Sequence, residues 1–384
     1  MNPRRVGLNV LYLVPGAVGG TETYARLLIG ELAKAAPETE FFVFCGTEAE
    51  EPLRGQGWPA NTRLVSVRLP SAIKPLRIAT ELSVLPVLAD RHRVDILHSL
   101  GTTSPPASRA ARVVTVHDLI YDRFPGSFSR AATAGLRLTV PLGARRAQRV
   151  IADSEATATD VRERLRVAPE RIDVVPLGLG APPALDATPA GEVRSRFELG
   201  DADVVLCVSA ALPHKNLGRL LEGFAGLSPA RRETSMLVVA GHAGRTLAEL
   251  QARAAGLGIA ERVRFTGWIS DADLEGLYAL ASAFVYPSLL EGFGLPVLEA
   301  MRRSVPVGCS TRGSLEEVAG DAALTFDPLD PRSIAAAIEQ LLADPGLRAT
   351  LIERGIARAA TFRWEATAAA TLASYERALT ARRG

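Results

Sequence analysis

Two glutamates, Glu291 and Glu299, flank a glycine-containing loop in the segment PSLLEGFGLPVLEAMRR. The loop follows an apolar strand, and Pro296 favours a helix after it, because the missing N–H of proline costs least in a first helical turn. Gly292 and Gly294 let backbone N–H groups approach a ligand, and the helix start attracts an anion such as a diphosphate. We expect Glu299 in the first helical turn. Either glutamate alone could be a helix-dipole or surface acid, but together they could accept hydrogen bonds from sugar hydroxyls.

A second segment, CVSAALPHKNLGRLLEGF, predicts a strand, then Lys215, then a helix for which Asn216 would be the N-cap. The Lys215 ammonium could neutralise a diphosphate. A single lysine at such a place is more often an ordinary surface charge. The second anion-binding loop in the same half of the chain favours the binding role.

The first half of the chain carries two further candidates. Gly19 and Gly20 lie between a predicted strand and helix, where they suit close backbone approach to a ligand or form only a turn. They do not complete a G-x-G-x-x-G dinucleotide fingerprint. His117 and Asp118 follow the run VVTV, at the carboxyl end of a strand, where open α/β sheets bind ligands. A buried core histidine is the alternative to a substrate contact.

These residues need an alternation of strands and helices to position them, and the hydrophobic pattern predicts one. The expected strands are residues 6–14, 41–45, 95–98, 113–117, 204–209, 236–240, 263–265 and 283–286, and the expected helices are 22–34, 216–224, 246–255 and 271–280. A stretch rich in Pro, Gly and Ala near residues 178–191 reads as a linker between two α/β halves.

Composition limits the alternatives. A chain of 384 residues exceeds the usual size of one hydrophobic core, and a net charge of +2 does not indicate nucleic-acid binding. Cys45, Cys207 and Cys309 are odd in number, far apart and not in a C-x-x-C pair, so they indicate neither a disulfide framework nor a zinc site, and the five histidines add no metal cluster. No apolar run approaches the roughly 18 residues of a membrane span, so we expect a cytoplasmic protein.

Together these segments resemble the retaining family-4 glycosyltransferases, also called glycosyl transferases group 1, over almost the whole chain. The most specific match is the E-x7-E segment from Glu291 to Glu299. Supporting matches are GGTETY near the start, HDL at 117–119, ADSEAT at 152–157, VVPLG at 174–178, PHKN at 213–216, EVAGDAALTFDPLDP at 317–331 and the final FRWEATAAATLASYERAL.

The resemblance implies an α/β protein with the GT-B fold, in which two Rossmann-like domains face each other across a cleft. Residues 1–180 would bind the acceptor, residues 181–362 the nucleotide-sugar donor, and a helix in 363–384 would pack back on the first domain. By the same resemblance, Glu299 would hold the ribose, Glu291 the transferred sugar and Lys215 the diphosphate. The remaining implied contacts are the loop backbone at Gly292, Phe293, Gly294 and Leu295, closure on the diphosphate by Gly19 and Gly20, and His117 against the donor sugar.

One position departs from the family pattern. Members often carry an arginine five residues before the lysine, and here that position is Ala210. Arg245 is a candidate replacement. The implied reaction retains the anomeric configuration, uses no protein nucleophile and needs neither a metal nor another cofactor. The alternatives to a glycosyltransferase are a nucleotide-sugar 2-epimerase of the same fold and a nucleotide-sugar-binding protein without activity.

Similarity to bacterial mannosyltransferases favours GDP-mannose as the donor, with UDP-hexoses next. The acceptor could be a glycan, a lipid-linked sugar or a small molecule. The segment 127–150 combines leucines with five arginines. This combination suggests peripheral contact with the inner face of a membrane, although a solvated helix is the simpler interpretation.

Overall fold

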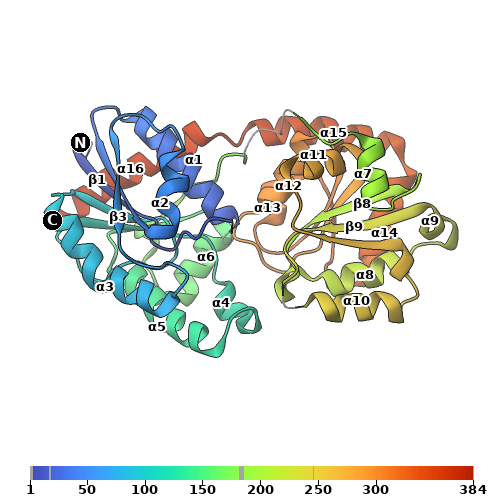
Figure 1. The fold of residues 1–384 in the computed structure, drawn as a ribbon, viewed down its shortest axis with the longest axis horizontal. Helices are drawn as coiled ribbons and strands as arrows, with labels where there is room; N and C mark the ends of the chain where they lie inside the picture. The colour runs from blue at the N-terminus through green and yellow to red at the C-terminus, as the bar shows by residue number, and fades with distance from the viewer. Residues whose placement is uncertain (1–2, 17–18, 181–185, 245, 384) are drawn as a thin grey trace. The chain divides into compact units, whose positions relative to one another are not determined.

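The computed structural model describes residues 3–16, 19–180, 186–244 and 246–383. The chain divides into two compact units (Figure 1). Unit 1 comprises Met1–Gly180 and Phe362–Gly384, and unit 2 comprises Ala181–Thr361. Each unit is built on one parallel β-sheet covered by helices, which is the arrangement that the alternating hydrophobic pattern predicts.

Unit 1 contains a seven-stranded sheet in the order β3-β2-β1-β4-β5-β6-β7. The strands are β1 (Arg5–Asn9), β2 (Glu40–Gly46), β3 (Thr62–Val67), β4 (Ile96–Ser99), β5 (Ala111–Val116), β6 (Arg149–Ala152) and β7 (Ile172–Val174). The helices are α1 (Gly20–Ala35), α2 (Thr47–Arg54), α3 (Lys74–Arg91), α4 (Ile120–Arg123), α5 (Arg130–Arg146), α6 (Glu155–Arg164) and α16 (Trp364–Arg383). Every strand pairs in parallel with its neighbours.

Strand β1 is shorter than the expected 6–14, because the chain turns directly after Asn9. The Asn9 side-chain oxygen accepts a hydrogen bond from the backbone N–H of Leu11 at 3.1 Å, and the N–H of Leu13 bonds to the carbonyl of Val10 at 2.9 Å. Asparagine commonly forms such local turns, which compete with a continued strand. The apolar run after residue 9 is therefore a buried turn at the carboxyl edge of the sheet.

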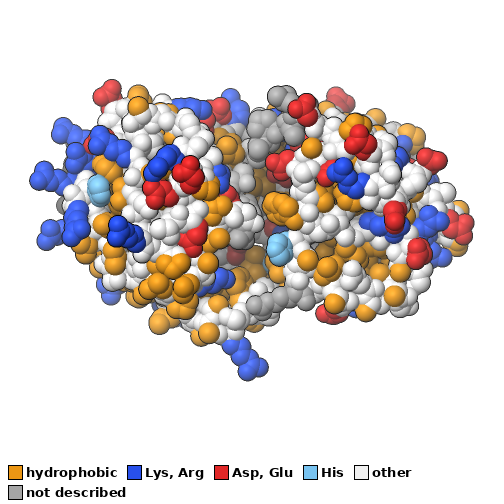
Figure 2. Space-filling view, in the orientation of Figure 1, with side chains coloured by type: hydrophobic (Ala, Val, Ile, Leu, Met, Phe, Trp, Pro, Cys, Tyr) orange, Lys and Arg blue, Asp and Glu red, His pale blue; other side chains and the backbone are white. Residues whose placement is uncertain are grey.

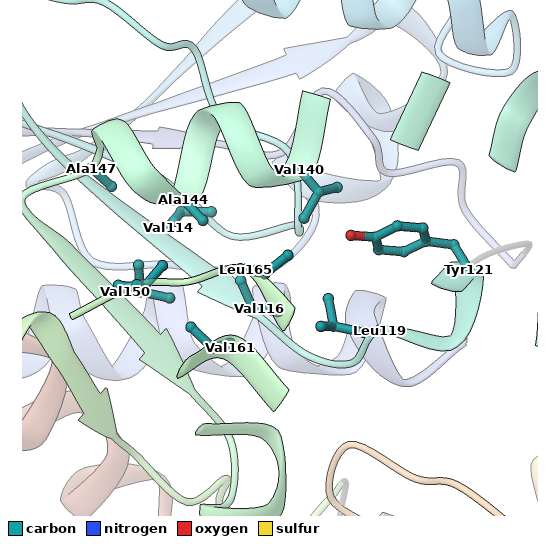
Figure 3. Packing of buried hydrophobic residues seen from close by; sticks show 11 residues of the cluster. Val114, Val116, Leu119, Tyr121, Val140, Ala144, Ala147, Val150, Val161 and Leu165 are labelled. Atoms are coloured by element: carbon teal, nitrogen blue, oxygen red, sulfur yellow. The ribbon is translucent and has the colours of Figure 1, made fainter. Parts of the chain in front are cut away.

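Helix α5 covers β5 and β6 through small and branched side chains (Figure 3). Val140 and Ala144 point from α5 toward Val114, Val116 and Val150 of the sheet, and all five are buried. Gly143 allows an even closer approach, because a Cβ there would lie 2.7 Å from the backbone oxygen of Ser104. Because this side of α5 packs against the sheet, the opposite side of the helix remains exposed.

The C-terminal helix α16 returns to unit 1 and packs against α1, β4, β5 and β6. The Trp364 indole N–H donates to the carbonyl of Leu179 at 2.7 Å, and the Thr367 hydroxyl donates to that of Pro176 at 2.8 Å. A Cβ on Gly178 would lie 2.4 Å from Cγ of Trp364, so only glycine fits there without displacement. The VVPLG segment and the FRWE segment are therefore two halves of one contact.

Unit 2 contains a six-stranded parallel sheet in the order β10-β9-β8-β11-β12-β13. The strands are β8 (Asp203–Val208), β9 (Ser235–Ala240), β10 (Val263–Gly267), β11 (Ala281–Tyr286), β12 (Val307–Ser310) and β13 (Leu324–Phe326). The α-helices are α7 (Ala190–Arg196), α8 (Leu217–Ala225), α9 (Pro229–Thr234), α10 (Leu247–Gly256), α11 (Asp271–Leu280), α12 (Leu295–Arg302), α13 (Leu315–Ala319), α14 (Pro331–Ala343) and α15 (Pro345–Ala360).

The predicted elements recur with shifts of a few residues, and α11 has the expected bounds. Of the expected linker, residues 181–185 lie outside the described part of the chain. The described cysteines Cys45, Cys207 and Cys309 are buried and free. His98 is buried between the hydroxyls of Tyr375 and Thr115, at 2.8 and 2.9 Å, so it has a structural role.

Candidate active site

The sheet of unit 2 has a topological switch point between its neighbouring strands β8 and β11. From β8 the chain proceeds to β9 on one side, and from β11 it proceeds to β12 on the other. In open α/β sheets, the crevice at the carboxyl ends of two such strands is the usual ligand site. Lys215 follows β8 and Glu291 follows β11, so both lie at this edge.

The two loops at the switch point are joined by hydrogen bonds. The His214 carbonyl accepts bonds from the Leu289 N–H at 2.8 Å and from the Ser288 hydroxyl at 3.1 Å. The Asn216 side-chain amide donates to the carbonyls of Pro287 and Pro328, at 3.1 and 2.7 Å. Asn216 occupies the N-cap position of α8, but its side chain does not cap the helix. The expected cap is therefore wrong, because the side chain joins the loops instead.

Lys215 and Glu291 form a direct ion pair, with 2.6 Å between Nζ and Oε1. Nζ also donates to the Tyr286 hydroxyl at 2.9 Å. Both charged side chains are mostly buried, at 15% and 11% exposure. A cation and a carboxylate from separate strand ends thus meet within one hydrogen-bonded cluster.

Burial is the largest influence on the pKa of Glu291 and would raise it. The charge and the hydrogen bond of Lys215 outweigh burial, so the pKa lies below its usual value. Burial raises the pKa of Tyr286 well above its ordinary range, and the Glu291 charge adds to the effect. The cluster therefore combines a carboxylate, an ammonium and a neutral phenol, which together can donate and accept hydrogen bonds.

The loop from Glu291 to α12 is shaped by Gly294 and Ser314. Gly294 has φ +111°, and a Cβ there would lie 2.6 Å from a methyl of Leu315. The Ser314 hydroxyl contacts the carbonyls of Phe293 and Glu291 at 2.6 and 3.2 Å, which fixes the loop against α13. Gly292, Phe293 and Leu295 complete the loop that precedes and opens α12. The first N–H groups of a helix lack intrahelical partners, so this end of α12 suits an anion.

Glu299 lies deeper in α12 than the sequence predicts. The helix begins at Leu295, so Glu299 falls in its second turn, and the first turn contains no acid. The expected first-turn placement is wrong, because the helix starts before Pro296. Burial raises the pKa of Glu299 and outweighs the nearby Arg303 charge, which lowers it, and the Glu275 charge adds to the rise. Arg303 pairs with Glu275, and the Glu299 carboxylate accepts no hydrogen bond from any residue that the structure describes.

Ala210 lies at the same edge, beside a small cavity of about 10 Å³. Its lining includes Ser209, Gly241, His242 and Phe265. A Cβ on Gly241 would lie 2.5 Å from the Ser209 carbonyl oxygen, so the loops after β8 and β9 are closely packed here. Arg245, the candidate replacement for the missing arginine, lies outside the described residues.

In unit 1, Gly19 and Gly20 form the start of α1. Gly19 is the N-cap residue, with φ +59°, a conformation that favours glycine. One turn later, the buried Tyr24 ring packs edge-on against the His117 ring, with 4.7 Å between centroids. The structure thus brings the glycine turn and His117 into one neighbourhood through Tyr24.

His117 directly follows β5 and uses both ring nitrogens within the protein. Nδ1 lies 2.6 Å from Oδ2 of Asp153, and Nε2 lies 2.8 Å from the Leu100 carbonyl oxygen. A carbonyl oxygen only accepts, so Nε2 donates to Leu100, and the neighbouring Asp153 carboxyl group favours a second proton on Nδ1. Burial would lower the pKa of His117, but the charge of Asp153 and the hydrogen bonds outweigh it and raise the pKa.

Sequence reasoning missed several residues of these sites. Tyr286 and Ser288 fall in a predicted strand and the loop after it, Tyr24 falls in a predicted helix, and Asp153 belongs only to a motif of the family. Asp153 does carry a usable signal, since it directly follows β6 at the carboxyl edge of the sheet. The others gain their role only through contacts between segments distant in sequence.

Two family models cover most of the chain. The Glycosyltransferase Family 4 model matches residues 18–179, and the Glycosyl transferases group 1 model matches residues 192–358. The chain belongs to the family-4, group 1 glycosyltransferases. The two matched regions fall in units 1 and 2, and the fold of the chain is GT-B.

Relatives of this chain include O-antigen chain mannosyltransferase B of Escherichia coli, 39% identical over 48% of either chain. The MMP alpha-(1->4)-mannosyltransferase of Mycolicibacterium hassiacum is 33% identical over 62% of this chain and 56% of its own. The chain thus spans about half the length of these curated relatives. Sucrose-phosphate synthase of Thermosynechococcus elongatus shares the fold, with a TM-score of 0.75, 20% identity and coverage of 97% and 98%.

Proposed function

We propose that the protein transfers a hexose from a nucleotide-sugar donor to an acceptor hydroxyl, with retention of anomeric configuration. The observation that carries the proposal is the pairing of Lys215 with Glu291 at the switch point, beside the start of α12 and a Glu299 carboxylate that accepts no hydrogen bond from the described residues. A nucleotide sugar carries a diphosphate, a ribose and a hexose, and these three groups call for three kinds of protein contact. The carboxyl edge of unit 2 offers all three.

We assign the diphosphate to Lys215 and to the backbone N–H groups between Gly292 and Leu295. The ribose hydroxyls would donate to the Glu299 carboxylate, which accepts no hydrogen bond from the described residues. The hexose hydroxyls would donate to the carboxylate of Glu291, whose Oε1 also accepts the hydrogen bond from Lys215. Since Lys215 and Glu291 touch, the diphosphate and the sugar would bind next to each other, as they do within one donor molecule.

In the proposed step, the bond between the anomeric carbon and the diphosphate oxygen breaks, and its electron pair leaves on that oxygen. The acceptor hydroxyl attacks the anomeric carbon from the same face, and its proton passes to a phosphate oxygen. Lys215 and the start of α12 stabilise the charge that develops on the diphosphate. Binding holds the acceptor and donor in reacting geometry, so no protein nucleophile is required.

We propose that these fixed positive groups serve without a metal ion. The loss of arginine at Ala210 leaves fewer cations on the diphosphate than related enzymes often have, so a modest donor affinity is expected. Turnover should be unchanged after treatment with EDTA. A loss of turnover that magnesium restores would contradict the metal-independent form of the proposal.

The donor sugar is proposed to be mannose, and the donor GDP-mannose, because two of the relatives carry the name mannosyltransferase. The acceptor would be a glycan, a lipid-linked sugar or a small hydroxylated molecule bound by unit 1. Contacts of Gly19, Gly20 and His117 with the donor stay predictions. A cytoplasmic location also stays a prediction.

The test is incubation with a panel of nucleotide sugars, following release of nucleoside diphosphate with and without candidate acceptors. Acceptor-dependent release with an α-linked product from an α-linked donor would support retaining transfer. Release or isomerisation without any acceptor would favour a 2-epimerase. Binding without release would favour a protein that kept the fold and lost the reaction, the outcome that Ala210 makes worth testing.

A further inference from the structure

The outer face of α3 is apolar, although it faces solvent. Ile73, Leu76, Val84 and Val87 are 52%, 46%, 42% and 51% exposed and recur at helical spacing along one side. The acid in the middle of the helix, Glu81, points inward and is 1% exposed, with its Oε2 accepting a bond from Thr103 at 2.6 Å. Surface helices normally show the opposite arrangement.

Helix α5 repeats this feature. Val140 and Ala144 face the sheet (Figure 3), so Leu138 and Leu142 face outward, at 70% and 38% exposure. The sequence of α5 contains no acidic residue, and Arg145 and Arg146 stand in its last turn. We call Ile73, Leu76, Val84, Val87, Leu138 and Leu142 the docking face. Figure 2 shows hydrophobic side chains gathered over α3 in unit 1.

Basic side chains gather where α5 ends. Arg146, Arg171 and Arg382 are close enough for their charges to act on the half-buried Arg112. The nearby buried acid Asp173 is already paired with Arg149 and Arg377. Arg112 and Arg171 each keep a buried Nε that lacks a hydrogen-bond partner in the described part of the chain. This end of unit 1 therefore attracts anions.

We propose that the docking face binds unit 1 to the surface of an anionic lipid bilayer. The apolar side chains would enter the boundary between head groups and acyl chains, and the arginines at the end of α5 would contact acidic head groups. No helix within the described ranges is long and apolar enough to span a membrane. The contact is thus of the kind that lies on a bilayer, and it goes beyond the transfer reaction and does not depend on it.

Charge favours a bilayer over a second copy of the chain. Two docking faces brought together would also bring together their flanking arginines, which repel one another. An anionic surface satisfies both features at once, because it accepts apolar side chains and neutralises the arginines. Exposed apolar side chains bordered by charge are typical of an interaction surface.

The experiment is flotation of the full chain with phosphatidylcholine vesicles containing phosphatidylglycerol, compared with vesicles of phosphatidylcholine alone. We expect the protein to float with the anionic vesicles at low salt, and to bind much less to neutral vesicles or in 0.5 M salt, about the concentration at which surface charges are strongly screened. Protein that stays at the bottom of the gradient with anionic vesicles at low salt would overturn the proposal.

Matched variants locate the contact. Val87→Glu and Leu138→Glu should each lower the partition coefficient about tenfold, since each removes an inserted apolar side chain and adds a repelled charge. Ile356→Glu in α15 of unit 2 is the control, because Ile356 is 46% exposed, much like Val87. Arg146→Gln should weaken binding to anionic vesicles only. Equal flotation of Leu138→Glu, Val87→Glu and Ile356→Glu would place binding elsewhere and refute the docking face.

Light scattering without vesicles completes the test. A monomer is expected for the native chain and every variant. A dimer that Leu138→Glu dissociates would show that the docking face binds a second copy, which would overturn the lipid proposal. Because flotation requires no donor or acceptor, its failure would leave the proposed transfer reaction untouched, and an inactive protein could still float.

Discussion

At the level of single residues, Glu291 and Glu299 share a loop and helix but differ in their partners. Glu291 is bonded to Lys215, whereas Glu299 is unpartnered among the described residues. Glu299→Ala should therefore weaken both the donor and free nucleoside diphosphate, because both carry the ribose. A lost hydrogen bond to a charged group is worth about 1.5–3 kcal/mol, or roughly a 10- to 150-fold change in affinity, which calorimetry resolves.

Glu291→Ala should leave the affinity for nucleoside diphosphate unchanged or slightly raised, because it frees Lys215, while turnover falls. Glu249→Ala, at an exposed position of α10, is the control. Equal losses of diphosphate affinity in Glu291→Ala and Glu299→Ala, with folding preserved, would contradict the separate roles. No loss in either would remove the donor from this loop.

His117 provides a prediction about pH. Its pKa is raised in the folded protein, so the unfolded chain, with a pKa of about 6.5, releases the proton first as pH rises. The imidazolium therefore contributes stability that is fully present below about pH 6.5 and is lost as the pH rises through the higher folded pKa. Unfolding of unit 1 by urea should require less denaturant at high pH than at pH 6.

NMR titration of the imidazole signals measures the same effect directly. One signal, absent in His117→Gln, should titrate above the ordinary histidine range, and Asp153→Asn should move it down. His98 and His214 do not interfere, because burial lowers their pKa values to about 3 and about 4. A His117 signal that titrates at or below its ordinary value would contradict the imidazolium assignment.

At the level of elements, the start of α12 depends on Gly294. Alanine would have to adopt φ +111° and place a Cβ 2.6 Å from Leu315, so the loop must shift. We expect Gly294→Ala to cost about 1–3 kcal/mol of stability and to lower donor affinity, since the loop N–H groups move. Gly256→Ala in α10 is the control, because a Cβ there meets nothing within 4 Å and φ is not positive. Similar behaviour of the two variants in denaturation and calorimetry would contradict a shape requirement at Gly294.

The elements themselves could be predicted because their signals are local. Apolar runs and glycine breaks identify β8, β11 and the loops after them, and parallel strands must then share a carboxyl edge. The ion pair of Lys215 with Glu291 and the pair of His117 with Asp153 join segments 76 and 36 residues apart, so no local pattern records them. Asn216 shows the same limit, since its type and position suit a cap while its tertiary partners decide its role.

Helix α3 shows where hydrophobic patterning misleads. Apolar side chains at helical spacing are normally read as the buried face, and on that reading Val84 and Val87 would point inward. The helix instead buries Glu81 and Leu85 and exposes the valines. Helical spacing of apolar side chains therefore does not show which face of α3 is covered, because coverage depends on what lies against the helix.

At the level of the whole molecule, the chain leaves unit 1, forms unit 2 and returns through α16 to complete unit 1. The return is held by the contacts of Trp364 and Thr367 with the 176–179 segment and by the bond of Ser374 to Asp173 at 2.7 Å. Unit 1 is therefore incomplete without residues from both ends of the chain. The stability of unit 1 should therefore depend on the contact of α16 with the 176–179 segment, whereas the stability of unit 2 should not.

Gly178→Ala tests this dependence. The added Cβ would lie 2.4 Å from Cγ and 2.5 Å from the backbone nitrogen of Trp364, so α16 must move away. Overpacking of this kind costs about 1–3 kcal/mol, which should lower the urea midpoint of unit 1.

Gly135→Ala in α5 is the matched control in the same unit, where the Cβ meets nothing within 4 Å and should stabilise the helix by about 0.5–1 kcal/mol. Nucleoside diphosphate binding, assigned to unit 2, should be unchanged in both variants at low urea. Two outcomes would contradict the view that α16 belongs to unit 1 alone. One is a urea midpoint of unit 1 that does not change in Gly178→Ala, and the other is a loss of nucleoside diphosphate binding in that variant.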